Sequence, residues 1–169
     1  MELPGTSYLY TIATLAITYA GFAALIVLFR QIIGGAVSNV DVFIIHNILL
    51  RGLIVTCSAL LPPALALFDL SHSVIWRISS IVAALLQGLF ISTHPIRRRA
   101  ITDVPLPTWS LILLGLGALT AIVLVMNALG IFGKPAAGPF VASITAFLII
   151  SFVAYLEQLG ILLRGPAKK

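Results

Sequence analysis

The segment TWSLILLGLGALTAIVLVMNALGIF, residues 108–132, decides the fold class because it carries no charged residue over its whole length. About 20 mostly apolar residues are enough for a helix to cross the hydrocarbon core of a bilayer. Four other segments have the same character, at about 10–33, 42–68, 74–93 and 139–163. The sequence therefore predicts an all-α integral membrane protein, a compact bundle of five transmembrane helices that forms one domain over residues 1–169.

The composition of the chain supports this prediction. Hydrophobic residues make up 60% of the sequence and charged residues only 9%, whereas soluble domains carry about 25% charged residues. The net charge of +5 does not indicate nucleic-acid binding, because few of the charges are free to form a solvated basic face. The expected surroundings are the lipid bilayer, and no nucleic-acid partner is expected.

Breaks between the apolar segments contain the Gly, Pro, Ser and charged residues that end helices. They are GGAVSN (34–39), DLSHS (69–73), HPIRRRAITDVPLP (94–107) and GKPAAGP (133–139). Four spans are the fallback, with the second or third segment lying on the membrane surface instead of crossing it.

Basic residues predict the orientation, because Lys and Arg are enriched on the cytoplasmic side of membrane proteins. The triplet Arg97, Arg98 and Arg99 assigns the third break to that side. Alternation then places the N-terminus outside and the C-terminus in the cytoplasm. The other basic residues on the inner side are Arg30, Arg51, Arg164, Lys168 and Lys169, and only Arg77 and Lys134 fall outside.

The first span, TIATLAITYAGFAALIVLFRQ (11–31), resembles the opening helix of small bacterial membrane proteins that carry no assigned activity. This resemblance implies a multi-pass protein of a bacterial inner membrane and implies no function.

A candidate polar cluster lies in the second and fifth spans. In HNILLR (46–51), Asn47 and Arg51 are four residues apart and share a helix face. Glu157 lies at a similar depth in the fifth span, and charged residues inside membranes usually pair with one another. We expect Arg51 to meet Glu157. The residues of the predicted cluster are His46, Asn47, Arg51, Glu157, Gln158 and Arg30. The alternative is that each of them only marks the end of a helix.

Other residues predict contacts between helices or with lipid. Gln87 and Asn127 lie deep enough in their spans to hydrogen-bond to a neighbouring helix. Small residues recur every four positions and predict close packing between helices. They are Ala16, Ala20 and Ala24 in the first span, Gly117 and Ala121 in the fourth, and Ala142 and Ala146 in the fifth. Anionic lipid headgroups are possible ligands of Arg97, Arg98 and Arg99, although a role in orientation alone explains the triplet as well.

Enzyme signatures are missing from the sequence. It contains no phosphate-binding loop, zinc-protease motif or serine elbow. His46 and His94 are both predicted on the inner side, but no other haem signature accompanies them, so we expect no cofactor and no metal. The favoured function is a non-catalytic membrane component that associates with itself or with other membrane subunits. An oligomeric channel or transporter for an ion or small solute is the alternative, and a lipid-directed intramembrane enzyme is the third.

Overall fold

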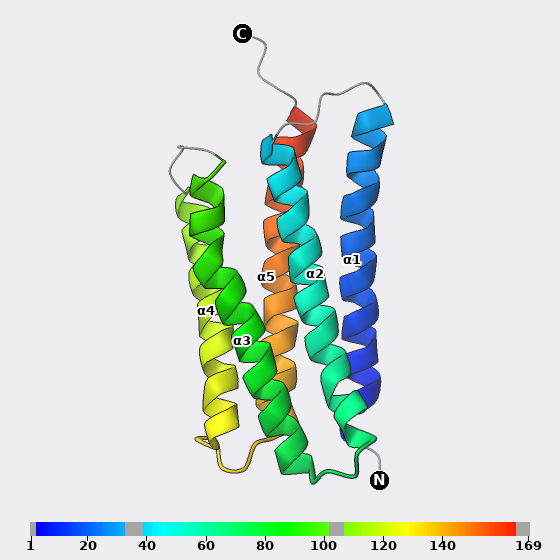
Figure 1. Cartoon of the computed structure of the whole chain (residues 1–169), viewed down its shortest axis with the longest axis vertical. Helices are drawn as coiled ribbons and strands as arrows, with labels where there is room; N and C mark the ends of the chain where they lie inside the picture. The colour runs from blue at the N-terminus through cyan, green and yellow to red at the C-terminus, as the bar shows by residue number, and fades with distance from the viewer. Residues whose placement is uncertain (1–2, 33–38, 102–106, 165–169) are drawn as a thin grey trace.

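The computed structural model describes residues 3–32, 39–101 and 107–164, apart from the side chains of residues 27, 30, 31, 159 and 161–164. Over these residues the chain forms helices and no strand. The helices are α1 (Thr6–Ile32), α2 (Asn39–Ala66), α3 (His72–Arg99), α4 (Thr108–Leu129) and α5 (Ala137–Arg164). Each helix runs antiparallel to the one before it (Figure 1). All five are long and apolar enough to cross a membrane, which confirms the prediction of five such helices. That all five cross the bilayer, instead of the four of the fallback, stays a prediction.

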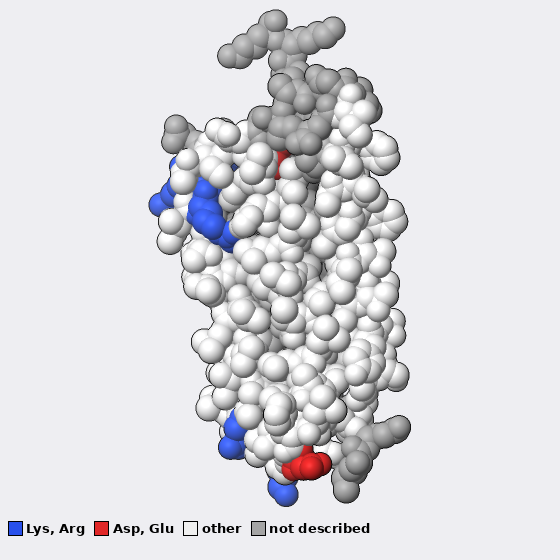
Figure 2. Space-filling model, turned by 45° about the vertical axis from the view of Figure 1, so that its right-hand side comes forward, with Lys and Arg blue, Asp and Glu red and all other residues white. Residues whose placement is uncertain are grey.

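The interior of the bundle combines small and polar side chains with large apolar ones such as Trp76 and Phe140. Large apolar side chains also cover its outside. Ala16, Ala59, Ala83, Ser79 and Ser80 are fully buried. The exposed residues include Leu15, Phe22, Leu85, Leu89, Leu119 and Phe152. On the face shown in Figure 2, charged atoms gather near the two ends of the molecule and a broad uncharged band separates them. Such a surface suits a hydrocarbon solvent, in which the helices are held together by close packing.

The helices differ in how they pack. α1 packs mainly against α2, and α3 packs mainly against α4, while α5 lies against both α2 and α4 (Figure 1). The α1–α2 contact depends on Gly52, which is buried. A Cβ atom at this position would lie 2.9 Å from the Cβ of Ala20 and 3.2 Å from the carbonyl oxygen of Ala16. The two backbones can therefore approach this closely only because position 52 has no side chain.

The predicted small-residue faces have different roles in the structure. Ala16 and Ala20 contact α2 at Gly52, whereas Ala24 is exposed. Gly117 lets α4 approach both α3 and α5, because a Cβ there would lie 3.4 Å from Ile91 Cδ1 and 3.6 Å from Phe147 Cε2. The α1 and α4 predictions are thus confirmed at these contacts. Ala142 is exposed and Ala146 is half-buried, and both line a groove described below.

Two helix ends differ from the predicted segments. α3 continues through Pro95 to Arg99 instead of ending near Thr93. Proline removes one backbone hydrogen bond, but the extension buries His94 and places three arginines in the last turn, where cations interact favourably with the helix dipole. α4 ends at Leu129 because Gly130 adopts a left-handed conformation, with φ of 74°, and caps the helix.

Candidate functional site

The predicted polar residues of α2 and α5 lie in the half of the bundle nearest the end where α2 begins and α3 and α5 end, and we call this half the Arg51 end (Figure 1, top). His46 is exposed there, whereas Asn47 is fully buried. The Nδ2 of Asn47 donates a hydrogen bond to the carbonyl of Phe43 (2.9 Å), and its Oδ1 has no hydrogen-bond partner. Arg51 is 7% exposed, so its charge lies almost completely inside the bundle.

Two guanidinium groups share one aromatic ring at the Arg51 end. The Cζ of Arg51 lies 5.1 Å from the ring centroid of Phe90, and the Cζ of Arg97 lies 5.3 Å from the same centroid. Cation–π attraction to the ring holds both groups in place. Their nitrogens are nevertheless incompletely bonded: Arg51 Nη1, Arg97 Nε and Arg97 Nη2 are buried without a hydrogen-bond partner. The two positive charges also repel each other.

Helical spacing on α3 explains why these residues meet. Phe90, His94 and Arg97 follow one another at intervals of four and three residues and therefore lie on one face of the helix. The ring of His94 is buried between two phenylalanines, 5.8 Å from Phe90 and 5.6 Å from Phe43. Its Nδ1 has no hydrogen-bond partner. α3 therefore contributes Phe90, His94 and Arg97 to the site.

The structure brings Glu157 near Arg51 without a direct contact between them. Glu157 is half-buried and interacts electrostatically with Arg51. Gln158 is also half-buried, and its Oε1 has no hydrogen-bond partner. Arg51 Nη1 donates a hydrogen bond to neither residue, so the close Arg51–Glu157 pair stays a prediction. The side chain of Arg30 lies outside the described residues.

The three arginines that end α3 occupy different environments. Arg97 is half-buried and turns toward Phe90, whereas Arg99 is exposed. Arg98 is half-buried and takes part in interactions of its own. Lipid-headgroup binding by the triplet stays a prediction. Arg97 contacts the ring of Phe90, and Arg98 acts electrostatically on His94.

Sequence reasoning missed the aromatic residues of the Arg51 end. Tyr19 of α1 is buried, and its ring meets Tyr155 of α5 edge-on at a centroid distance of 5.4 Å. Tyr19 also interacts electrostatically with Arg51. The helical spacing of Phe90, His94 and Arg97 could have indicated that they share one face. This spacing is apparent only if the helix is assumed to continue through Pro95.

Deeper polar groups connect helices, as predicted for Gln87 and Asn127. The Thr120 hydroxyl donates to Gln87 Oε1 (3.0 Å) and thereby joins α4 to α3. Asn127 Nδ2 donates to Ser80 Oγ (2.9 Å) and to the carbonyl of Ala136 (3.1 Å), while Asn127 Oδ1 accepts from the amide of Ala136 (3.1 Å). One amide thus ties α3, α4 and the connection to α5 together. Gln87 is fully buried inside the monomer, so lining an oligomeric pore would require it to leave this contact.

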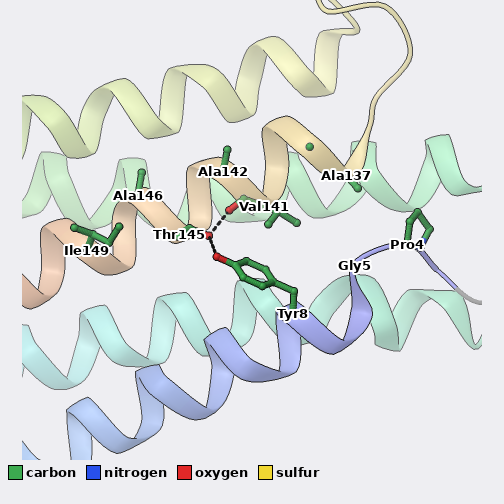
Figure 3. A pocket seen from close by; sticks show the side chains of 10 residues that line it. Pro4, Gly5, Tyr8, Ala137, Val141, Ala142, Thr145, Ala146 and Ile149 are labelled. Carbon is green, nitrogen blue, oxygen red and sulfur yellow. Dashed lines mark hydrogen bonds between the residues drawn. The ribbon is translucent and has the colours of Figure 1, made fainter.

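A groove lies at the opposite end, between the start of α1 and the first half of α5 (Figure 3). Its volume is about 640 Å³. The lining residues are Pro4, Gly5, Tyr8, Ala137, Gly138, Val141, Ala142, Thr145, Ala146 and Ile149. The Tyr8 hydroxyl donates to Thr145 Oγ1 (3.3 Å), because that oxygen itself donates to the carbonyl of Val141 (2.8 Å). We call this surface the α1–α5 groove.

Comparison with known proteins gives no family for this chain. No protein-family model, curated protein sequence or solved structure matches it. Among the described residues, no group of three or more His, Cys, Asp or Glu side chains is arranged to hold a metal ion. Functional inference therefore depends on the two surfaces described above.

Proposed function

We propose that this protein is a non-catalytic, multi-pass component of a bacterial inner membrane that associates through the α1–α5 groove with a transmembrane helix. That helix belongs to a second copy of the chain or to another membrane subunit. The supporting observation is a row of small residues on α5, Gly138, Ala142 and Ala146, spaced by four and lining the groove.

The row has the chemistry of a helix–helix interface. Inside lipid, helices associate where small side chains let the backbones come close. The corresponding row on α1 packs against Gly52 of α2. The row on α4 packs against α3 and α5 at Gly117. A Cβ added at Gly138 would meet no atom within 4 Å, and Ala142 is exposed. The α5 row is therefore available to a helix from outside the monomer.

Filling the groove should break this association. We expect Ala142→Trp to reduce the yield of a cross-linked complex in native membranes by about tenfold, because a bulky ring replaces a close contact. Leu119→Trp is the matched control, since Leu119 is exposed on α4 away from the groove. The cross-linked mass identifies the second copy or the other subunit. Equal yields for both variants, or no complex with the unaltered protein, would contradict the proposal.

The proposed orientation, with the N-terminus outside and the C-terminus in the cytoplasm, has a separate test. Cys57 is the single cysteine of the chain, so Cys57→Ala provides a cysteine-free background. In intact cells, an impermeant thiol reagent should label Lys134→Cys, which precedes α5, and should leave Lys168→Cys unlabelled until the membrane is opened. The reverse labelling pattern would invert the orientation and leave the association proposal standing.

A further inference from the structure

We propose that the Arg51 end is a binding site for a phosphate group, held between the guanidinium groups of Arg51 and Arg97 beside the ring of Phe90. This site lies at the other end of the bundle from the α1–α5 groove and requires no partner helix. It is thus independent of the proposed association, and the two proposals can fail separately.

The electrostatics of the Arg51 end favour a bound anion. Arg51 is 7% exposed, and a charge buried in a membrane protein is normally paired. Arg97, which is also positively charged, lies against the same Phe90 ring and repels Arg51. Glu157 acts on Arg51 only through space, and Arg51 Nη1 keeps no hydrogen-bond partner. An anion between the two guanidinium groups would remove the repulsion and satisfy the unbonded nitrogens.

The number and kind of hydrogen-bond donors at the Arg51 end favour a phosphate as the bound anion. Three buried guanidinium nitrogens without partners come from two different side chains: Arg51 Nη1, Arg97 Nε and Arg97 Nη2. Guanidinium groups bind phosphate oxygens through parallel N–H donors. A phosphate offers several oxygens in a tetrahedral arrangement and can therefore accept from both arginines at once. A carboxylate can also bridge two arginines, but its two oxygens lie in one plane, whereas the tetrahedral oxygens of a phosphate can face two guanidinium groups that are not coplanar.

The Arg97 side of the site lies close to the end of the bundle. Arg97 belongs to the last turn of α3 and is half-buried, although its Nε and Nη2 are themselves buried. A phosphate would therefore reach these atoms from the end of the bundle, and Arg97 would turn to admit it. Helices that span a bilayer place such end residues at the level of the headgroups. The phosphate therefore comes either from the headgroup of an anionic lipid or from a soluble phosphate compound, and both present the same chemistry to the arginines.

The test measures binding by the purified protein in an uncharged detergent. Thermal unfolding is followed while inorganic phosphate, short-chain dihexanoyl phosphatidic acid or the phosphate-free dihexanoylglycerol is added at matched ionic strength. We expect a rise in Tm with a phosphate-bearing probe and none with dihexanoylglycerol. A rise with phosphatidic acid alone identifies a lipid headgroup, whereas a rise with inorganic phosphate identifies a site for free phosphate.

Two variants and one control assign the effect to the site. Arg97→Gln should weaken the apparent affinity by about tenfold or more, because it removes a charged hydrogen-bond donor. Arg51→Met should behave in the same way. Arg99→Gln removes an equal charge from the same turn, but Arg99 is exposed. The affinity of this variant for the phosphate-bearing probe should therefore match that of the unaltered protein. Equal responses of all three variants, or no rise in Tm with either phosphate-bearing probe, would overturn the proposal.

Discussion

Replacing Gly52 by alanine should lower the free energy of unfolding by about 1–3 kcal/mol, the usual cost of overfilling a packed contact. The added methyl group would lie 2.9 Å from the Cβ of Ala20 and 3.2 Å from the carbonyl oxygen of Ala16. Neither atom is the end of a flexible side chain, so the steric overlap can be removed only if α1 moves away from α2. Gly52→Val should cost more, because it adds two further methyl groups at the same contact.

Trp76 provides the measurement, because it is buried against Phe140 and its fluorescence reports loss of packing. Unfolding by a denaturing detergent gives the free-energy change. Gly115→Ala is the matched control, since a Cβ at that position would meet nothing within 4 Å. It should change stability by less than about 1 kcal/mol. If Gly52→Ala and Gly115→Ala unfold alike, the α1–α2 contact is not as close as the structure has it.

Replacing Arg51 by methionine should raise stability by about 1–4 kcal/mol in delipidated, phosphate-free protein, because an apolar side chain of similar length removes a buried charge. The unbonded Nη1 of Arg51 and the repulsion from Arg97 are both lost in this variant. Such a gain in stability would fit a residue that is kept for binding at a cost in stability.

Glu157→Gln provides the companion measurement. This change should destabilise the unaltered protein by roughly 1 kcal/mol, because Glu157 is a compensating charge for Arg51. In the Arg51→Met background it should have little effect, and the difference gives the coupling between the two residues. A loss of stability on Arg51→Met would show that the guanidinium group has a structural role instead. Strictly additive effects of the two changes would show that Glu157 does not compensate the charge of Arg51.

The arrangement of five helices was predictable because its cause is local. Long uncharged segments such as 108–132 and the Gly- and Pro-containing breaks depend only on composition along the chain. The contacts of Gln87 and Asn127 were predictable as well, since an amide inside a membrane needs a partner on another helix. Close packing at Ala16 and Gly117 followed from the spacing of small residues.

The site was only partly predictable, for a reason found on α3. Asn47 and Arg51 were correctly expected on one face of α2, where both are buried, whereas Arg97 was assigned to a loop because it follows Pro95. A single proline does not end a helix whose next residues gain more from packing than the lost hydrogen bond costs. Which side of the bundle Arg97 faces depends on the helix continuing to Arg99, and no pattern in the sequence alone indicates this.

The position of α5 has a consequence for how the chain assembles. α1 with α2 and α3 with α4 form two helical hairpins, each joined by consecutive segments of chain. α5 follows them in the sequence and contacts both hairpins, mainly through α2 and α4 (Figure 1). We therefore expect α5 to dock last across two hairpins that have already formed, so that Glu157 reaches the Arg51 end only at that step.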